Sequence, residues 1–200
     1  YLSSPVREEA LSLALASFDL LERHARERRF GGYWEALAED WKATPDRTLS
    51  PADIDCDKSM NTNLHVLEAF TNLYRASALP AVREAIVSLL DVHARRIVQS
   101  DGHLGLYFHS DWSRMDGKVS YGHDVEASWL MEETIEVLES RESESFLSAA
   151  ERETFAAARK AISALAETAL AEGIDPVSGA LEEEADSSVP GAKRNRHRIW

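Results

Sequence analysis

Apolar residues recur at the spacing of an α-helix over five long stretches of the chain, and this repeat limits the fold more than any other feature. Between residues 80 and 100, for example, one side carries Val82, Ile86, Leu89, His93 and Ile97. The same spacing predicts helices over about residues 4–26, 59–75, 80–100, 123–139 and 148–172. The sequence therefore predicts an all-α fold, with short extended pieces between residues 103 and 120 and a turn at Asp116-Gly117.

The expected helix ends carry characteristic residues. Ser4-Pro5 offers a capping hydroxyl and then a proline at the first helical position, while Gly31-Gly32 interrupts the first helical pattern and Gly173 ends the last one. Residues 182–198 are polar and predict a loop. One helix–loop–helix step takes about 35–45 residues, which is typical of helical repeats and α/α toroids. We therefore expect residues 1–200 to form a single, partial α/α-barrel domain.

The chain is strongly acidic, which excludes several classes of partner. Its 22 Lys and Arg against 35 Asp and Glu give a formal net charge of −13. Such a surface repels phosphate backbones and anionic lipids, so we expect neither nucleic acid nor a membrane as partner. The single cysteine, Cys56, permits no internal disulfide and no cysteine-based zinc site. A cytoplasmic location is the simplest expectation.

The expected helix over residues 59–75 carries a polar stripe on an otherwise apolar surface. Asn61, His65, Glu68 and Asn72 fall within a narrow arc of the helix, and leucines and aromatic residues fill much of the rest. A helix that is apolar around most of its circumference is usually buried, so its polar stripe needs partners or a ligand. An ordinary solvated face is the alternative, although such faces favour Lys, Glu and Arg.

The expected helix over residues 123–139 begins with a histidine that lies on its apolar, inward-facing side. His123 is in line with the apolar arc of this helix, and Glu126 follows at a distance that permits side-chain contact. The helix dipole disfavours an imidazolium there, whereas a neighbouring carboxylate favours it. Such a histidine suits proton transfer near neutral pH. A structural histidine satisfied by Glu126 or by a backbone carbonyl is the alternative.

Other candidate sites have less support. Asp124 and Glu126 could serve as paired glycosidase carboxylates, but residues two apart on a helix face different ways. His103, His109 and His123 lack the spacing of a metal site, and the basic run of residues 193–198 fits a solvated loop better than an anion site. The five tryptophans could stack on sugar rings or fill the core.

Two segments resemble a known family. Residues 58–75 read KSMNTNLHVLEAFTNLYR and residues 120–130 read SYGHDVEASWL. Both are similar to motifs of the N-acylglucosamine 2-epimerase superfamily, and within it to cellobiose 2-epimerases. Shorter matches strengthen the likeness, which spans essentially the whole chain: Gly31-Gly32-Tyr33, Asp40-Trp41, Asp111-Trp112 and the closing Arg198-Ile199-Trp200.

The resemblance implies an (α/α)6 barrel with its active site in the central cavity. The family epimerises sugars at C2 of the reducing end through a cis-enediolate, without nucleotide, metal or other cofactor. By motif, His123 matches one of two acid–base histidines and Glu126 its partner. Asn61 and His65 match positions that hold the sugar, and Trp200 matches an aromatic position that contacts it. The implied function is that of an isomerase, a sugar 2-epimerase whose partner is a small sugar; a homodimer is a further expectation.

Departures from the family pattern leave alternatives open. Asn63 stands where these enzymes often have another histidine. The family's N-terminal arginine and second catalytic histidine would lie before Tyr1 and after Trp200, so we expect further residues on both sides and doubt the activity of this segment alone. The alternatives are an aldose–ketose isomerase using the same site, an α/α-barrel glycoside hydrolase, and a non-catalytic carbohydrate-binding relative.

Overall fold

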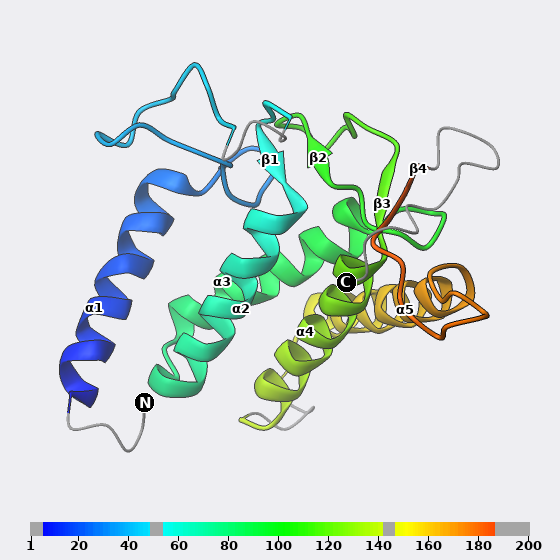
Figure 1. The fold of residues 1–200 in the computed structure, drawn as a ribbon. Helices are drawn as coiled ribbons and strands as arrows, with labels where there is room; N and C mark the ends of the chain where they lie inside the picture. The colour runs from blue at the N-terminus through cyan, green and yellow to red at the C-terminus, as the bar shows by residue number, and fades with distance from the viewer. Residues whose placement is uncertain (1–5, 49–53, 142–146, 187–200) are drawn as a thin grey trace.

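The computed structural model describes residues 6–48, 54–141 and 147–186 and is mainly helical (Figure 1). The helices are α1 (Arg7–Leu20), α2 (Met60–Ser77), α3 (Pro80–Val92), α4 (Tyr121–Glu139) and α5 (Ala149–Glu172). The first and third are each extended by a π-helical turn, η1 (Leu21–Ala25) and η2 (His93–Ile97). All five expected helices are therefore confirmed, within a few residues at each end.

The helices form two layers. In the first layer, α2 and α4 lie side by side and run in the same direction (Figure 1). In the second, α3 packs against α2 and α5 packs against both α4 and α3. A two-residue connection, Ala78 and Leu79, returns the chain from α2 to α3. Alternation of a parallel inner helix with an outer one is the arrangement expected of part of an α/α barrel.

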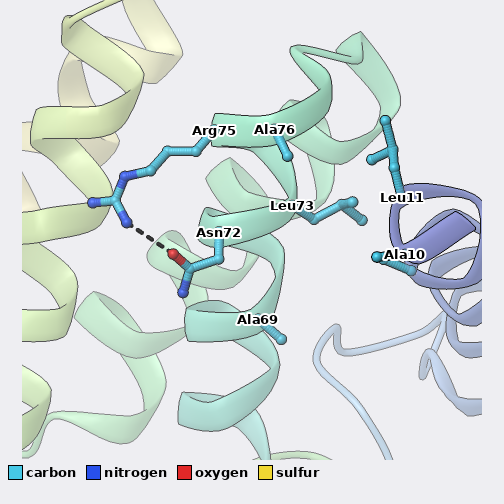
Figure 2. Close-up of a pocket in the computed structure, with 8 residues that line it drawn as sticks. Ala10, Leu11, Ala69, Asn72, Leu73, Arg75 and Ala76 are labelled. Atoms are coloured by element: carbon cyan, nitrogen blue, oxygen red, sulfur yellow. Dashed lines mark hydrogen bonds between the residues drawn. The ribbon is translucent and has the colours of Figure 1, made fainter. Parts of the chain in front are cut away.

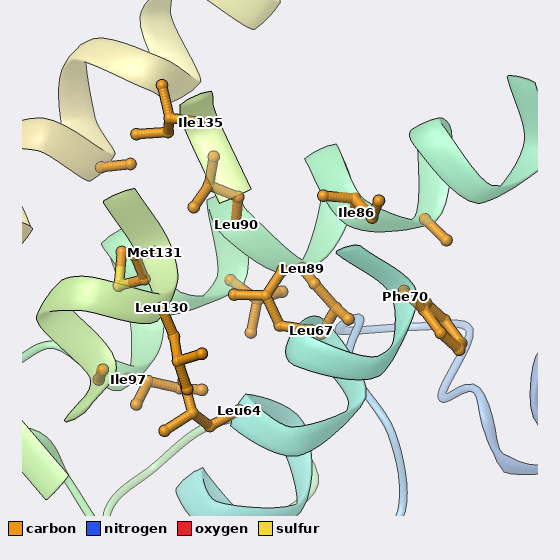
Figure 3. Packing of buried hydrophobic residues seen from close by; sticks show 14 of the residues in the cluster. Leu64, Leu67, Phe70, Ile86, Leu89, Leu90, Ile97, Leu130, Met131 and Ile135 are labelled. Carbon is orange, nitrogen blue, oxygen red and sulfur yellow. The ribbon is translucent and has the colours of Figure 1, made fainter. Parts of the chain in front are cut away.

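The core lies between the two layers. Figure 3 shows Leu64 and Leu67 of α2 packed with Leu89 of α3 and with Leu130 and Met131 of α4, and each of these side chains is at most 2% exposed. The arc expected to face inward on α4 is buried throughout: Ala127, Leu130, Thr134 and Leu138. Burial of these apolar surfaces fixes which side of each helix faces its neighbours.

Some of the residues at the helix ends form capping hydrogen bonds, and others do not. Ser59 caps α2 by accepting a hydrogen bond from the amide of Thr62, and Ser148 forms a capping box with Glu151 at the start of α5. Ser4-Pro5 lies outside the described residues, and α1 follows Val6 without a side-chain cap. Gly173 has an ordinary negative φ, so its small size matters instead: a Cβ there would meet the ring of Tyr121 at 2.7 Å.

Two short antiparallel sheets lie at the N-terminal ends of α2 and α4. Strand β1 (Lys58–Ser59) pairs with β2 (Tyr107–Phe108), and β3 (Lys118–Ser120) pairs with β4 (Glu184–Asp186). The prediction of a loop from residue 182 was wrong at its start, because residues 184–186 hydrogen-bond to β3. The chain reverses at residues 109–112, where Phe108 and Arg114 form a bridge. Within the described ranges, no helix has the length and hydropathy needed to cross a bilayer.

Candidate functional site

The loops concentrate at one end of the helical layers. Residues 26–57 connect η1 to β1 and α2, and residues 98–120 connect η2 to α4, whereas two residues suffice to connect α2 to α3 at the opposite end. Long connections held by a helical scaffold are the usual location of binding groups. The long loops therefore lie at the N-terminal ends of α2 and α4. All the predicted site residues in the described ranges lie in the first two turns of these helices.

The two parallel helices share one polar face, and Arg75 connects them across it. Arg75 of α2 donates to Asn72 at 2.8 Å and to Glu133 of α4 at 2.7 Å. Figure 2 shows the Arg75 side chain extending toward α4, on the side of α2 that faces away from α1. We call this the α2–α4 face, made of Asn61, His65, Glu68, Asn72 and Arg75 on α2 and Glu126 and Glu133 on α4. Its members recur every three or four residues on α2 and every seven on α4, so they lie on one side of each helix.

On α2, the predicted polar residues do lie on one side of the helix, and much of this side is exposed to solvent. Asn61 is half-buried, and the His65 side chain is 50% exposed. The Nδ1 atom of His65 lies 3.1 Å from a carboxylate oxygen of Glu68. This contact orients the imidazole along the helix. The stripe is therefore accessible to a small molecule at its N-terminal end, close to the loops.

On α4, His123 lies at the border between the buried arc and the α2–α4 face. Its side chain is half-buried, and its Nδ1 atom lies 2.7 Å from the hydroxyl of Ser120. Glu126, also half-buried, follows one turn later on the α2–α4 face. The sequence indicated Glu126 as the neighbour of His123, whereas the hydrogen bond of its Nδ1 goes to Ser120, the residue before the helix.

The adjacent Asp124 has a structural environment. It is fully buried; one of its oxygens lies 2.7 Å from His103 Nδ1 and the other accepts the amide of Leu104 at 2.9 Å. Burial opposes protonation of His103, but the hydrogen bond and charge of Asp124 outweigh it, so the pKa of His103 is raised. Asp124 therefore does not pair with Glu126 as glycosidase carboxylates would, in agreement with their helical spacing.

A buried lysine fixes the loops above α2. The ammonium of Lys58 donates to Glu27 at 3.0 Å and to the carbonyls of Gly31 and Ser110 at 2.7 and 2.6 Å. It also lies 4.5 Å from the ring centre of Trp112. The Lys58 side chain is completely buried, which lowers its pKa, although Glu27 opposes this effect. Sequence reasoning did not single out Lys58, since periodicity gives no sign that a charged residue is buried.

Asn63 is a second loop anchor. Its amide accepts from the backbone N–H of Tyr33 at 2.8 Å and donates to the carbonyls of Tyr33 and Ser59. The adjacent Gly32 has a φ of +80°, and a Cβ there would lie 2.4 Å from the Trp112 ring. Asn63, where the sequence was expected to depart from the family pattern, is therefore a fully buried residue that contacts backbone.

Two hollows adjoin α2. The first, of about 570 Å³, lies between α1 and α2, where Ala10 and Leu11 face Leu73 (Figure 2). The second, of about 350 Å³, includes Trp34 and Trp41 from the loop and Thr62 and Val66 from α2. Thr62 and Val66 directly follow Asn61 and His65 in sequence, so the second hollow borders the polar stripe.

The remaining predicted groups are the tryptophans, the basic run and the candidate metal ligands. Trp200 and the basic run of residues 193–198 lie outside the described residues. Trp112 is buried in the core, and Trp129 on α4 is 53% exposed. Across the described ranges, no three His, Cys, Asp or Glu side chains lie in an arrangement that could hold a metal ion.

Comparison with known proteins identifies the family. The model of the N-acylglucosamine 2-epimerase (GlcNAc 2-epimerase) family matches residues 3–189. The chain belongs to this family. A cellobiose 2-epimerase of Bacteroides fragilis is 40% identical over 131 residues, which are 65% of this chain and 33% of that protein. A cellobiose 2-epimerase of Dictyoglomus turgidum is 32% identical over 141 residues, 70% of this chain and 36% of that one.

Solved structures of the family share the fold. The cellobiose 2-epimerase of Spirochaeta thermophila superposes with a TM-score of 0.70 and 38% identity over 93% of this chain and 43% of its own. A sugar epimerase from a ruminal bacterium gives 0.77 and 26% identity over 94% of this chain and 44% of its own. The chain thus forms part of an (α/α)6 barrel, as expected, and spans about a third of the curated relatives named above.

Proposed function

We propose that the intact protein is a sugar 2-epimerase acting at C2 of a reducing-end aldose. The observation that supports this proposal is the α2–α4 face, because the predicted site residues of both family motifs belong to the first two turns of these packed helices. The names of the relatives point to cellobiose, a disaccharide, as the first substrate to test. The chain's acidic surface is consistent with an uncharged substrate.

The proposed chemistry assigns one role to each group. His123 takes the C2 proton, the electron pair of the C–H bond forms the C1–C2 double bond, and the aldehyde oxygen gains the negative charge of the enediolate. Asn61 and His65 are hydrogen-bonding groups for the sugar oxygens, and the Glu126 carboxylate, one turn away, stabilises the protonated form of His123. A base must lie within about 3 Å of the proton that it removes.

Epimerisation also needs a proton donor on the opposite face of C2. The family resemblance assigns this role to a histidine outside the present chain. When that group returns a proton to C2 and the double bond reverts to the aldehyde, the configuration is inverted and no atom is gained or lost. Return of the proton to C1 instead gives a ketose, which is how an isomerase would differ at the same site.

Incubation of the intact protein with cellobiose in D₂O tests the proposal. An epimerase yields the C2 epimer and places deuterium at C2 of the recovered disaccharides, as read by NMR. An unlabelled sugar with new reducing ends would indicate a hydrolase, and a ketose would indicate an isomerase. Binding without label exchange or product would support the non-catalytic alternative.

A further inference from the structure

Asp124 and His103 form a buried pair directly beside His123. Asp124 is 0% exposed and His103 4% exposed. Both carboxylate oxygens of Asp124 are occupied, one by the His103 imidazole at 2.7 Å and the other by the Leu104 amide at 2.9 Å. These bonds tie the first turn of α4 to the loop that follows η2, across 20 residues of sequence.

The opposite side of His103 contacts α5. Its Nε2 atom lies 3.4 Å from a carboxylate oxygen of Glu172, the last residue of α5. In the same loop, a Cβ at Gly102 would lie 2.3 Å from the hydroxyl oxygen of Thr168, so the loop backbone lies directly against α5. The His103 ring also packs edge-on against Tyr121, with ring centres 5.7 Å apart. The loop therefore packs between the start of α4 and the end of α5.

These contacts restrict how the first turn of α4 can rotate about the helix axis. Successive residues of a helix project about 100° apart, so fixing Asp124 in the interior also fixes the direction of His123. The hydroxyl of Ser120 then holds the His123 ring at Nδ1, 2.7 Å away. A reacting group that shifts by about 1 Å can lose a factor of roughly 10² in rate.

We propose that His103 and Asp124 are positioning residues for His123. They hold the first turn of α4 so that the His123 imidazole meets C2 of the sugar, and the hydrogen bond from His103 Nδ1 to Asp124 is the essential contact. This inference rests on the proposed function, since it assigns His123 to proton transfer. It goes beyond that function by giving an orienting role to two residues that do not touch the substrate.

Two substitutions of His103 separate positioning from packing. In His103→Asn the side-chain amide nitrogen takes the place of Nδ1 and keeps the donor to Asp124, whereas in His103→Gln the amide takes the place of Nε2 and loses that donor. We expect His103→Gln to lower kcat by about 10- to 100-fold with KM within about twofold. His103→Asn should restore most of the turnover. His109→Gln, at an exposed loop residue, is the matched control and should leave kcat unchanged.

The NMR signals of the His123 side chain give a readout that does not depend on turnover. They should move in His103→Gln and stay near the wild-type positions in His103→Asn. Equal loss of kcat in both variants, or an unchanged kcat with a lower Tm in His103→Gln, would show that the pair only stabilises the fold. If the wild-type protein does not epimerise, the proposed function fails, and unshifted His123 signals in His103→Gln would separately overturn the positioning role.

Discussion

The hydroxyl oxygens of Thr71 on α2 and Thr134 on α4 lie 3.0 Å apart in the buried seam between the two helices. Each hydroxyl also contacts a carbonyl of its own helix, Leu67 for Thr71 and Leu130 for Thr134. Thr71 lies 11 residues beyond the first residue of α2 and Thr134 lies 13 residues beyond the first residue of α4, so this contact sets the two N-terminal ends at nearly the same level. Asn61 and His123 thereby reach the same end of the molecule.

We expect Thr71→Val to lower the free energy of unfolding by about 1 kcal/mol, because it removes a buried hydrogen bond and leaves the hydroxyl of Thr134 with fewer partners. Thr134→Val should cost a similar amount. The double variant should cost less than the sum of the two, since both polar groups are then gone. Urea unfolding of all four proteins measures the coupling, and strict additivity would show that the contact contributes nothing.

Replacement of Lys58 by methionine should be strongly destabilising. Lys58→Met fills a similar volume but leaves the carboxylate of Glu27, which is 7% exposed, without its cation. Breaking a buried pair in this way typically costs about 3–5 kcal/mol. Lys42→Met is the matched control, because Lys42 is 80% exposed and pairs with Asp40 on the surface. Denaturant unfolding should show a large loss for the first variant and almost none for the second.

The start of α5 should contribute stability that is lost in acid. Hydrogen bonds from Ser148 and from Arg83 of α3 lower the pKa of Glu151 to about 2, from an ordinary value of 4.5. A lowered pKa means that the folded state binds fewer protons, so this contribution is present above about pH 4.5 and is lost as the pH falls toward 2. Ser148→Ala should cost about 1 kcal/mol at neutral pH. In Glu151→Gln the acid-dependent loss of Tm should become smaller, and an unchanged pH dependence would contradict the assignment.

The His103–Asp124 pair, by contrast, should contribute stability that is lost as the pH rises. Burial of His103 opposes its protonation, but Asp124, Asp101 and Glu172 all favour the protonated imidazole, and the pKa of His103 is raised above its ordinary 6.5. The folded state then binds more protons than the unfolded state between these two values. The contribution is complete below about pH 6.5 and is lost as the pH rises through the raised pKa. Thermal unfolding between pH 6 and 9 should show a slope that His103→Asn reduces, and equal slopes in both proteins would contradict it.

Two histidines of the proposed site should differ in their effect on catalysis. His123→Ala should abolish epimerisation in the intact protein with the helical circular dichroism nearly intact, because it removes the proposed base. His65→Ala should raise KM or lower turnover through loss of a sugar contact. Steady-state kinetics with cellobiose measures both. Retained turnover in His123→Ala would remove that residue from the mechanism, and unchanged kinetics in His65→Ala would make the α2 stripe an ordinary solvated face.

The sequence alone determined the elements and the faces that they bury. Helical spacing located all five helices, and the buried arc of α4 is the one that its apolar residues indicated. Periodicity succeeds here because burial of apolar side chains on one side is what stabilises a helix in a folded protein. The two long motifs, at residues 58–75 and 120–130, were also sufficient to indicate the family.

Only the tertiary structure decided which polar groups are buried and what they hold. Lys58, Asn63 and His103 each have a partner 21 to 52 residues away, and no local pattern marks those contacts. The strand at residues 184–186 was missed for the same reason, because it exists through pairing with β3. A buried polar group is stable only where a distant segment satisfies it, so its role is determined by packing and not by its neighbours in sequence.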